Sequence, residues 1–497
     1  MGEGGGKEVK GTEFFKNGGG IKGKEIGKRE QSNPDLFLSN YNYYLPPELI
    51  AKYPVEPRDS ARLLVYNRKN GEVKHTTFKN LLQFVPPEVH FIFNNTKVIK
   101  ARLWGQKESG GKVELLLNRP VAHFLETGNG TGSTMEKGTK RETLEVDGIK
   151  GVHSQLTGKK VRSRLHSAEK PTQFEVYIRG RVKVGTKLYF PSLKKPYLGA
   201  EVVELLSDGT RIVHFFKISD NPNLQIKGIA QKGIAQKESF TIDPSNSDFL
   251  NNSNQFLQNR ESLKGREYQK NGKGSELQNF FSHSPNGNSL KIGRLNSYLD
   301  FEGLLGILDQ IGEVPIPPYL NRKPDKSDEV HYQAIFASQA GAVAAPTASL
   351  HFTSRLMKQI QNSHFLTLHV GAGTFKPVES PNILNHQIHS EYYQIPLETA
   401  KIIDSKKPIV AVGTTSVRAI EYYYRTGKLT GECNLFLHPL NPPQRVDHLI
   451  TNFHLPKSTL LMLVSAFVGR ERCLELYREA VKEGYRFYSY GDGMLII

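Results

Sequence analysis

The last third of this 497-residue chain repeatedly places a polar loop between an apolar run and a helical pattern. The apolar runs 365–370 and 408–412 have the composition of buried strands. Helical periodicity covers 354–361, 416–424, 458–467 and 470–482, and Thr353 and Ser458 are placed to cap two of these helices. Strands that alternate with helices favour an α/β domain built on a largely parallel sheet.

Four of the loops at these junctions are small and rich in hydroxyl groups. In an α/β sheet such loops meet at the carboxyl edge of the strands, where ligands bind. Backbone N–H groups at the start of a helix attract anions and other polar ligands. We therefore expect one binding site assembled from the loops 344–349, 371–374, 413–416 and 451–458.

A different pattern precedes this region. Six short runs of β-branched, aromatic and alternating residues predict a small antiparallel β-barrel of about six strands, inserted into the α/β domain. On this reading the α/β domain comprises 37–90 and 291–497, and the barrel comprises 91–219. The predicted strands are 91–93, 100–105, 112–117, 174–178, 187–190 and 211–216.

Three stretches lack a periodic apolar pattern. Residues 1–36 predict a disordered basic tail, and 122–171 and 220–290 predict low-complexity insertions. The formal charge of +17 favours an anionic partner, nucleic acid first, although a basic but otherwise ordinary enzyme also explains it. The insertions are either solvent-exposed additions or segments that bind RNA through scattered Lys and Arg.

The two cysteines, Cys433 and Cys473, exclude a disulfide framework and a cysteine-based zinc site. The N-terminal sequence lacks the apolar core of a signal peptide, and the longest apolar run, 459–468, is too short to span a bilayer. We therefore expect a cytoplasmic protein with no membrane partner. We also expect a monomer.

Two of the loops carry groups suited to chemistry. The hydroxyls and amides of 413–416 suit a carboxylate, a phosphate or ribose hydroxyls, although an ordinary helix cap explains the pattern equally well. His454 beside Asn452 is a candidate acid–base pair, and the alternative is a histidine that only satisfies a backbone carbonyl. The loop 371–374 lacks the third glycine of a dinucleotide fingerprint, and no spacing of His or Cys favours a metal.

Eight blocks, in order from about Tyr41 to the C-terminus, closely resemble one enzyme family. They are PRDSARLL (57–64), FNNTKVIKARL (93–103), GAVAAPTA (341–348), LHVGAGTFKPV (368–378), HSEYY (389–393), VGTTSVRAIE (412–421), TNFHLPKSTLLMLVSAF (451–467) and YRFYSYGD (485–492). The family that they resemble is the S-adenosylmethionine:tRNA ribosyltransferase-isomerase of queuosine biosynthesis.

This resemblance implies a transferase-isomerase that acts on tRNA. The enzyme would attach the ribosyl part of S-adenosylmethionine to 7-aminomethyl-7-deazaguanine at the wobble position, giving epoxyqueuosine in tRNA with release of adenine and methionine. S-adenosylmethionine is then a substrate, and neither a cofactor nor a metal is expected. The resemblance also implies an α/β fold with an inserted six-stranded β-barrel.

The mechanism implied by the resemblance begins with loss of a proton from the ribose 5′ carbon, which the adjacent sulfonium acidifies. Adenine then leaves, the aminomethyl nitrogen attacks, and an epoxide closes as methionine departs. The candidate bases are the four histidines in or beside the family blocks: His351, His369, His389 and His454. Candidates for binding S-adenosylmethionine are Thr414, Thr415, Ser416 and Asn452, with Tyr392, Tyr393 and Phe453 as aromatic faces for the sulfonium. Candidates for binding RNA are Asn94, Asn95, Lys97 and Arg102.

The chain departs from the family pattern at several positions. Ser349 and Gly493 stand where Gly and Ala are usual, and we expect both changes to be tolerated. Residues 441–444 replace a segment that usually reads Gly-aromatic-Arg, which leaves substrate contacts near Arg445 open. Two rival functions are an RNA-binding protein without catalysis, against which the hydroxyl loops argue, and a methyltransferase, which would release S-adenosylhomocysteine.

Overall fold

The computed structural model describes residues 33–121, 173–190, 197–218, 298–375 and 377–497. The chain divides into two compact units, one comprising Met1–Thr96, His331–Gln339 and Ala345–Ile497, the other Lys97–Val330 and Ala340–Ala344. The predicted insertions 122–171 and 220–290 lie outside the described residues. So does most of the predicted tail, but Pro34–Leu36 forms a 3₁₀ turn and Leu36 is buried, so the tail is shorter than predicted.

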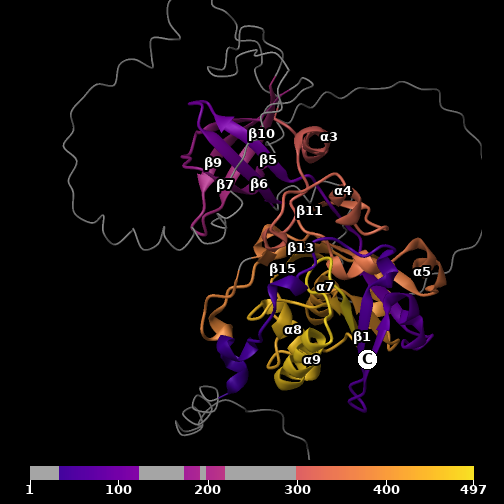
Figure 1. Cartoon of the computed structure of the whole chain (residues 1–497). Helices are drawn as coiled ribbons and strands as arrows, with labels where there is room; N and C mark the ends of the chain where they lie inside the picture. The colour runs from indigo at the N-terminus through magenta and orange to yellow at the C-terminus, as the bar shows by residue number, and fades with distance from the viewer. Residues whose placement is uncertain (1–32, 122–172, 191–196, 219–297, 376) are drawn as a thin grey trace, which may run out of the picture. The chain divides into compact units, whose positions relative to one another are not determined.

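A nine-stranded mixed sheet forms the centre of the first unit, in the order β15-β13-β12-β3-β14-β16-β17-β1-β2. Figure 1 labels β1, β13 and β15 of this sheet. β3 pairs in parallel with β12 and β14, β14 with β16, and β1 with β17. The other four neighbouring pairs are antiparallel, so the prediction of a largely parallel sheet is correct for only half of the strand pairs. The strands are β1 (Arg62–Tyr66), β2 (Val73–Thr77), β3 (His90–Asn94), β12 (Ser363–Leu368), β13 (Glu391–Gln394), β14 (Ile409–Val412), β15 (Thr430–Cys433), β16 (His448–Asn452) and β17 (Gly493–Ile496).

The helices of this unit agree with the periodicity of the sequence. They are α5 (Ser354–Gln359), α6 (Leu397–Asp404), α7 (Thr414–Thr426), α8 (Thr459–Val468) and α9 (Arg470–Lys482). The predicted caps are confirmed, because the hydroxyls of Thr353 and Ser458 accept hydrogen bonds from the N–H groups of Leu356 and Leu461. The apolar run 459–468 is α8, and none of the helices in the described part of the chain has the length and apolarity to cross a membrane.

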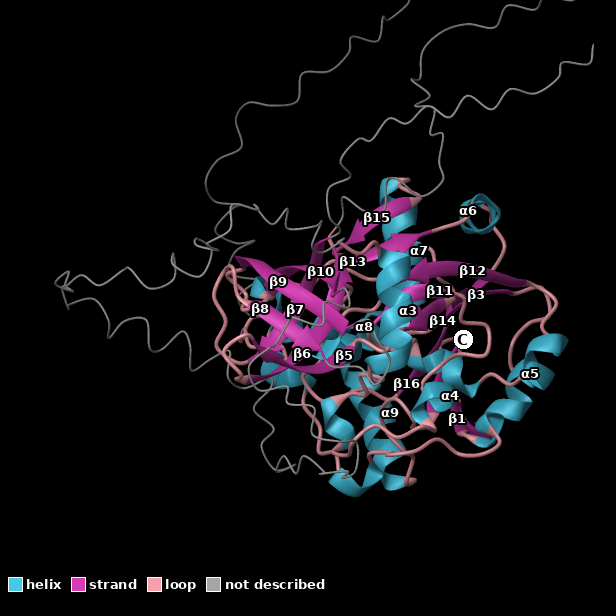
Figure 2. Ribbon diagram, turned by 90° about the horizontal axis from the view of Figure 1, so that it is seen from above, coloured by secondary structure: helices cyan, strands magenta, loops and turns pink. Residues whose placement is uncertain are grey.

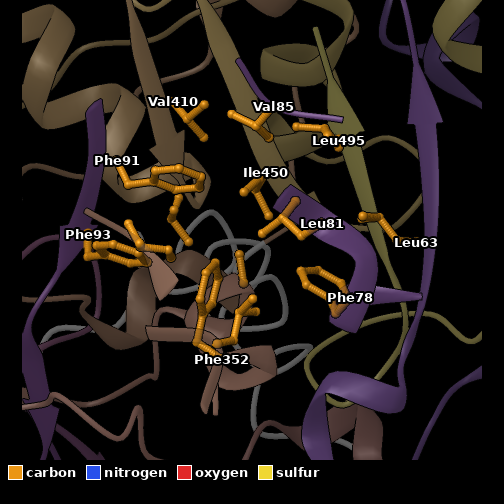
Figure 3. Close-up of a cluster of buried hydrophobic side chains, with 14 of the residues drawn as sticks. Leu63, Phe78, Leu81, Val85, Phe91, Phe93, Phe352, Val410, Ile450 and Leu495 are labelled. Carbon is orange, nitrogen blue, oxygen red and sulfur yellow. The ribbon is translucent and has the colours of Figure 1, made fainter. Parts of the chain in front are cut away.

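Apolar side chains cover one face of the sheet, as Figure 3 shows. Phe91 and Phe93 point into this cluster, where the Phe93 ring meets Phe352. The 3₁₀ helix η5 (Phe78–Gln83) contributes Phe78 and Leu81. Because side chains alternate along a strand, Ile92 and Asn94 face the opposite side. There α7 packs on β3, β12, β14 and β16 (Figure 2).

The second unit is built on six antiparallel strands that close in the order β10-β7-β6-β5-β8-β9. The strands are β5 (Arg102–Lys107), β6 (Lys112–Pro120), β7 (Gln173–Arg179), β8 (Lys187–Phe190), β9 (Tyr197–Leu205) and β10 (Arg211–Ile218), and α3 (Phe301–Ile311) belongs to the same unit. The strands β4 (Thr96–Val98) and β11 (Gln339–Ala342) pair with each other. Along the chain, the division between the units falls within the short α4 (Asp328–His331), after Val330.

The predicted strand count of this unit is confirmed, but one of its members is wrong. The run 91–93 is β3, a central strand of the large sheet, and the structure has β9 where no strand was predicted. A short apolar run shows that a strand is buried but not which sheet buries it. The predicted boundary at residue 291 is also misplaced, since α3 lies in the second unit.

Candidate active site

The carboxyl ends of four parallel strands meet at one edge of the large sheet. β12, β3, β14 and β16 are neighbours with the same direction. The residues that directly follow them are His369, Asn95, Gly413 and Phe453. Three of the four predicted site loops, 371–374, 413–416 and 451–458, therefore begin at this edge, as the order of strands and loops in the sequence predicts.

Asn94 ties three of these elements together. Its amide nitrogen donates to the Leu368 carbonyl at 2.9 Å and to the Thr415 hydroxyl at 3.3 Å. Its amide oxygen accepts from the N–H groups of Thr96 and Leu368. Asn94 is fully buried, and every hydrogen-bonding position of its amide is occupied. We therefore withdraw Asn94 as a candidate for RNA and assign it to holding β3, β12 and α7 in register.

The start of α7 offers the polar groups that the sequence suggested. Gly413 lies at φ 90°, a conformation that favours glycine, and leads directly into the helix. Thr415 is partly exposed, whereas Thr414 is buried. Ser416 is fully buried and its hydroxyl donates to the Val412 carbonyl at 2.7 Å, which stabilises the first turn and leaves the hydroxyl proton engaged. Of the three predicted hydroxyls, Thr415 is thus the one open to a ligand.

The fourth predicted loop, 344–349, is connected to the same edge by a contact with Asn452. The Thr347 hydroxyl donates to the Asn452 amide oxygen at 2.9 Å. The Asn452 amide nitrogen lies 3.1 Å from Nε2 of His351 and 3.2 Å from the Tyr488 carbonyl. The predicted pair of Asn452 with His454 is therefore wrong, because the histidine that Asn452 contacts is His351.

His454 is anchored inside the protein. Its Nε2 lies 2.8 Å from the Thr451 hydroxyl, its N–H donates to the Tyr477 hydroxyl, and its carbonyl accepts from the Tyr43 hydroxyl. Burial lowers its pKa to about 3. His351 is buried as well, stacks on the Phe78 ring with 4.1 Å between centroids, and has its pKa lowered to about 3, mainly by burial. Neither ring is open to a substrate in this structure.

His369 differs from these two residues because its ring is partly exposed. Its ring Nδ1 lies 2.7 Å from the Thr96 hydroxyl, and its backbone N–H donates to the Tyr392 carbonyl at 2.9 Å. The ring also stacks on Tyr392, with 6.0 Å between centroids. Burial lowers the pKa of His369 to about 4, so the ring is neutral at neutral pH.

A buried ion pair lies beside this edge, and the sequence patterns did not single it out. Arg418 on α7 donates to the Glu391 carboxylate and to the carbonyls of His389, Cys433 and Leu435. The other oxygen of Glu391 accepts from the Gly371 N–H and the Thr374 hydroxyl. The pair therefore fixes the loop 371–374 against β13 and α7. Glu391 occurs in the family block HSEYY, and Arg418 occurs in VGTTSVRAIE. Opposite charges in two such blocks were the feature of the sequence that could have indicated this ion pair.

A pocket opens over this ion pair. Its walls include Ile388, Phe436 and Leu463, and its polar groups include Thr374, His389, Glu391 and Arg418. The His389 ring lies so near Gly373 that a Cβ there would come within 2.7 Å of it. Among the described residues, no group of three or more His, Cys, Asp or Glu is arranged to hold a metal ion.

The predicted aromatic faces separate into one open and two closed residues. Phe453 is fully buried against Tyr477, Tyr485 and Phe487, and Tyr393 is fully buried as well. A buried ring cannot face a sulfonium, so these two assignments are wrong in this structure. Tyr392 is partly exposed and remains the candidate face.

The remaining predicted RNA contacts fall in different places. Asn95 is partly exposed in the first unit, where its amide oxygen accepts from the Thr367 hydroxyl. Lys97 is exposed and belongs to the second unit. Arg102, also in the second unit, lies 3.3 Å from the Glu114 carboxylate.

Arg445 has a structural role. Its guanidinium donates to the carbonyls of Ile402, Ile403, Ser405 and Lys407. The fully buried Glu421 accepts from the N–H groups of Gln444, Arg445 and Val446. The replaced segment 441–444 therefore precedes a backbone that is held from inside the protein.

Comparison with known proteins gives matches along nearly the whole chain. The model of the queuosine biosynthesis protein family matches residues 38–234 and 255–496. A protein of a Nitratiruptor species, named S-adenosylmethionine:tRNA ribosyltransferase-isomerase, is 42% identical over 465 residues, covering 93% of this chain and 99% of that protein. A protein of the same name from Campylobacter jejuni subsp. jejuni serotype O:23/36 (strain 81-176) is 43% identical over 468 residues, covering 94% and 100%.

A solved structure of S-adenosylmethionine tRNA ribosyltransferase from Thermotoga maritima is also similar, with 25% identity, a TM-score of 0.37, and coverage of 92% of this chain and 100% of that one. That TM-score is too low to support a structural argument. The family match and the two relatives are sufficient without it: the chain belongs to the queuosine biosynthesis protein family, that of the S-adenosylmethionine:tRNA ribosyltransferase-isomerases.

Proposed function

We propose that this protein transfers and isomerises the ribosyl part of S-adenosylmethionine onto 7-aminomethyl-7-deazaguanine at the wobble position of tRNA. The products are epoxyqueuosine in tRNA, adenine and methionine. Membership of the family supports the reaction. The observation that carries the location of the site is the meeting of four polar loops at the carboxyl edge of β12, β3, β14 and β16. A tRNA substrate also favours a cytoplasmic location, and the monomer stays a prediction.

S-adenosylmethionine binds at this edge in our proposal. The first turn of α7 presents backbone N–H groups that have no partner within the helix, and these favour the methionine carboxylate or the ribose hydroxyls. Thr415 adds a partly exposed hydroxyl at the same place. Tyr392, which is partly exposed, is the candidate π face for the positive sulfonium.

The experiment that tests the reaction is product analysis. S-adenosylmethionine labelled in the adenine, ribose and methionine parts is incubated with tRNA that carries the deazaguanine base. We expect label from ribose in the tRNA and equal amounts of free adenine and methionine. Release of S-adenosylhomocysteine would identify a methyltransferase, and tRNA binding without any product would identify an RNA-binding protein.

The experiment that tests the location uses Thr415. Loss of one hydrogen bond to the donor in Thr415→Ala should raise the Kd for S-adenosylmethionine by about 3- to 10-fold. Thr415→Ser keeps the hydroxyl and should bind within about twofold of wild type. An unchanged Kd in the alanine variant would move the donor away from the start of α7.

A further inference from the structure

Of the candidate histidines, His389 lines the pocket over the Glu391–Arg418 pair, with its ring against Gly373. Among the other three, His369 has the geometry of a base. The Nε2 atoms of His351 and His454 contact Asn452 and Thr451 in the protein interior. In His369 the internal contact is made by Nδ1 instead, at 2.7 Å from the Thr96 hydroxyl. Nε2, on the other side of a partly exposed ring, has no hydrogen-bond partner among the described residues. That atom is the one available to a substrate.

The contacts of the Thr96 hydroxyl bear on which nitrogen of His369 carries the proton. The Thr96 hydroxyl has two neighbours, Nδ1 of His369 at 2.7 Å and the Gln339 carbonyl at 3.4 Å. A carbonyl accepts only, so a favourable contact with Gln339 requires the hydroxyl proton to point at Gln339. The hydroxyl oxygen then offers a lone pair to Nδ1 of His369. A hydrogen bond forms there only if Nδ1 carries the ring proton and donates it. This arrangement satisfies both contacts and leaves a lone pair on Nε2.

The ring is also held in position. The Tyr392 ring stacks on the His369 ring, and the Tyr392 carbonyl accepts from the backbone N–H of His369. Asn94 binds both the N–H and the carbonyl of the preceding residue, Leu368. The same Asn94 amide contacts Thr415, so His369 and the start of α7 are linked through one side chain. A preorganised ring beside the donor loop is what proton abstraction requires.

We propose that His369 is the base that removes the proton from the ribose 5′ carbon of S-adenosylmethionine, and that Thr96 is the positioning residue that keeps Nε2 unprotonated. In this step the C5′–H bond breaks and an N–H bond forms at Nε2. The electron pair stays on C5′, where the adjacent sulfonium stabilises it, and no oxidant or reductant is needed. This inference rests on the proposed function, because the proposed reaction begins with removal of the C5′ proton.

The first test is His369→Asn. The asparagine amide can occupy the Nδ1 position and contact Thr96, but it has no group at Nε2. We expect turnover to fall by at least about 100-fold, with the Kd for S-adenosylmethionine within about threefold of wild type. Bound donor also shows that the variant is folded, and His369→Gln replaces it if it is not. Turnover within about tenfold of wild type in a folded variant would overturn the assignment.

The second test isolates Thr96. Thr96→Val removes the hydroxyl without changing the shape of this fully buried residue, and Thr96→Ser keeps the hydroxyl. Thr399→Val is the matched control, since Thr399 is also buried and its hydroxyl donates to a carbonyl of β12, that of Phe365, at 2.7 Å. We expect Thr96→Val to lower kcat by about 10- to 100-fold without raising the KM for the donor. Thr96→Ser should keep most of the wild-type kcat.

S-adenosylmethionine deuterated at C5′ gives a readout that a merely structural role would not change. Slower proton removal should raise the deuterium isotope effect on turnover in Thr96→Val but not in Thr399→Val. Equal rates and isotope effects in these two variants would overturn the role of Thr96. If wild type releases no adenine and methionine, the proposed function fails; if wild type and His369→Asn both release them at similar rates, only the base is misassigned.

Discussion

Gly493 lies against the ring of Phe78 so closely that a Cβ on Gly493 would come within 2.7 Å of two ring carbons. Phe78 is fully buried, and the same ring stacks on His351, which contacts Asn452 at the candidate site. Gly493 stands where Ala is usual in the resembling family, and in this structure the glycine leaves room for the Phe78 ring. The glycine and the phenylalanine are matched to each other.

Gly493→Ala should lower the free energy of unfolding by about 1–3 kcal/mol, because a packed core must shift to accept the methyl group. The measurement is urea unfolding. Gly306→Ala is the control, since a Cβ on Gly306 of α3 meets no described atom within 4 Å and alanine should stabilise that helix by up to about 1 kcal/mol. Equal effects of the two substitutions would contradict the clash.

Ser349 is the second departure from the family pattern that carries a prediction. Its hydroxyl is fully buried and has no hydrogen-bond partner in the part of the chain that the structure describes. Ser349→Ala should therefore raise the free energy of unfolding by about 1 kcal/mol. Ser465→Ala should lower it by a similar amount, about 1 kcal/mol, because the equally buried Ser465 hydroxyl donates to the Leu461 carbonyl at 2.8 Å. Chemical denaturation of both variants checks the opposite signs.

The buried pair of Glu391 and Arg418 should be costly to break. Glu391→Gln keeps the shape of the side chain but leaves the Arg418 guanidinium buried without its counter-charge, so we expect a loss of about 3–5 kcal/mol. Glu72→Gln is the comparison, since Glu72 and Lys74 form an exposed pair at 3.1 Å that should contribute no more than about 1 kcal/mol. A loss below about 1 kcal/mol for Glu391→Gln would show that the pair does not hold the loop.

Three histidines whose pKa values are lowered in the folded protein should make it sensitive to acid. Burial lowers the pKa of His351 and His454 to about 3 and that of His369 to about 4, from 6.5. Between these values the unfolded chain binds more protons than the folded one, so their contribution to stability is complete above pH 6.5 and is lost as the pH falls toward 4. We expect His454→Gln to reduce the loss between pH 6.5 and about 4.5 by about 2 kcal/mol, as measured by urea unfolding. A parallel pH dependence in this variant would mean that His454 is not held neutral.

Much of the positive charge lies outside the described residues. The described part holds 37 Lys and Arg against 31 Asp and Glu, a net +6 of the total +17, and the stretches 122–171 and 220–290 hold 17 of the 66 Lys and Arg. Replacing both stretches with short Gly-Ser linkers should leave turnover within about threefold, because no family block is touched. The salt dependence of tRNA affinity should become shallower if these lysines and arginines contact phosphates. An unchanged slope would place the phosphate contacts elsewhere, and loss of turnover in a folded variant would assign the stretches a role in the reaction.

The sequence was sufficient for the features that depend on neighbours along the chain. The caps at Thr353 and Ser458 and the extent of α9 follow from hydrogen bonds and periodicity within a few residues. The meeting of three hydroxyl loops at one edge also follows, because loops after parallel strands share an edge whatever the order of the strands. The eight family blocks together indicated the proposed reaction, which no single motif indicated.

Only the tertiary structure decided how individual side chains are used. Phe453, Ser416 and Asn94 look like ligand groups in the sequence, but packing and internal hydrogen bonds leave them closed. Four histidines were equivalent in the sequence, and contacts with residues far along the chain separated them, Thr96 with His369 and Asn452 with His351. Exposure and hydrogen-bond partners depend on which distant segments of the chain pack together. A local sequence pattern does not show which segments these are.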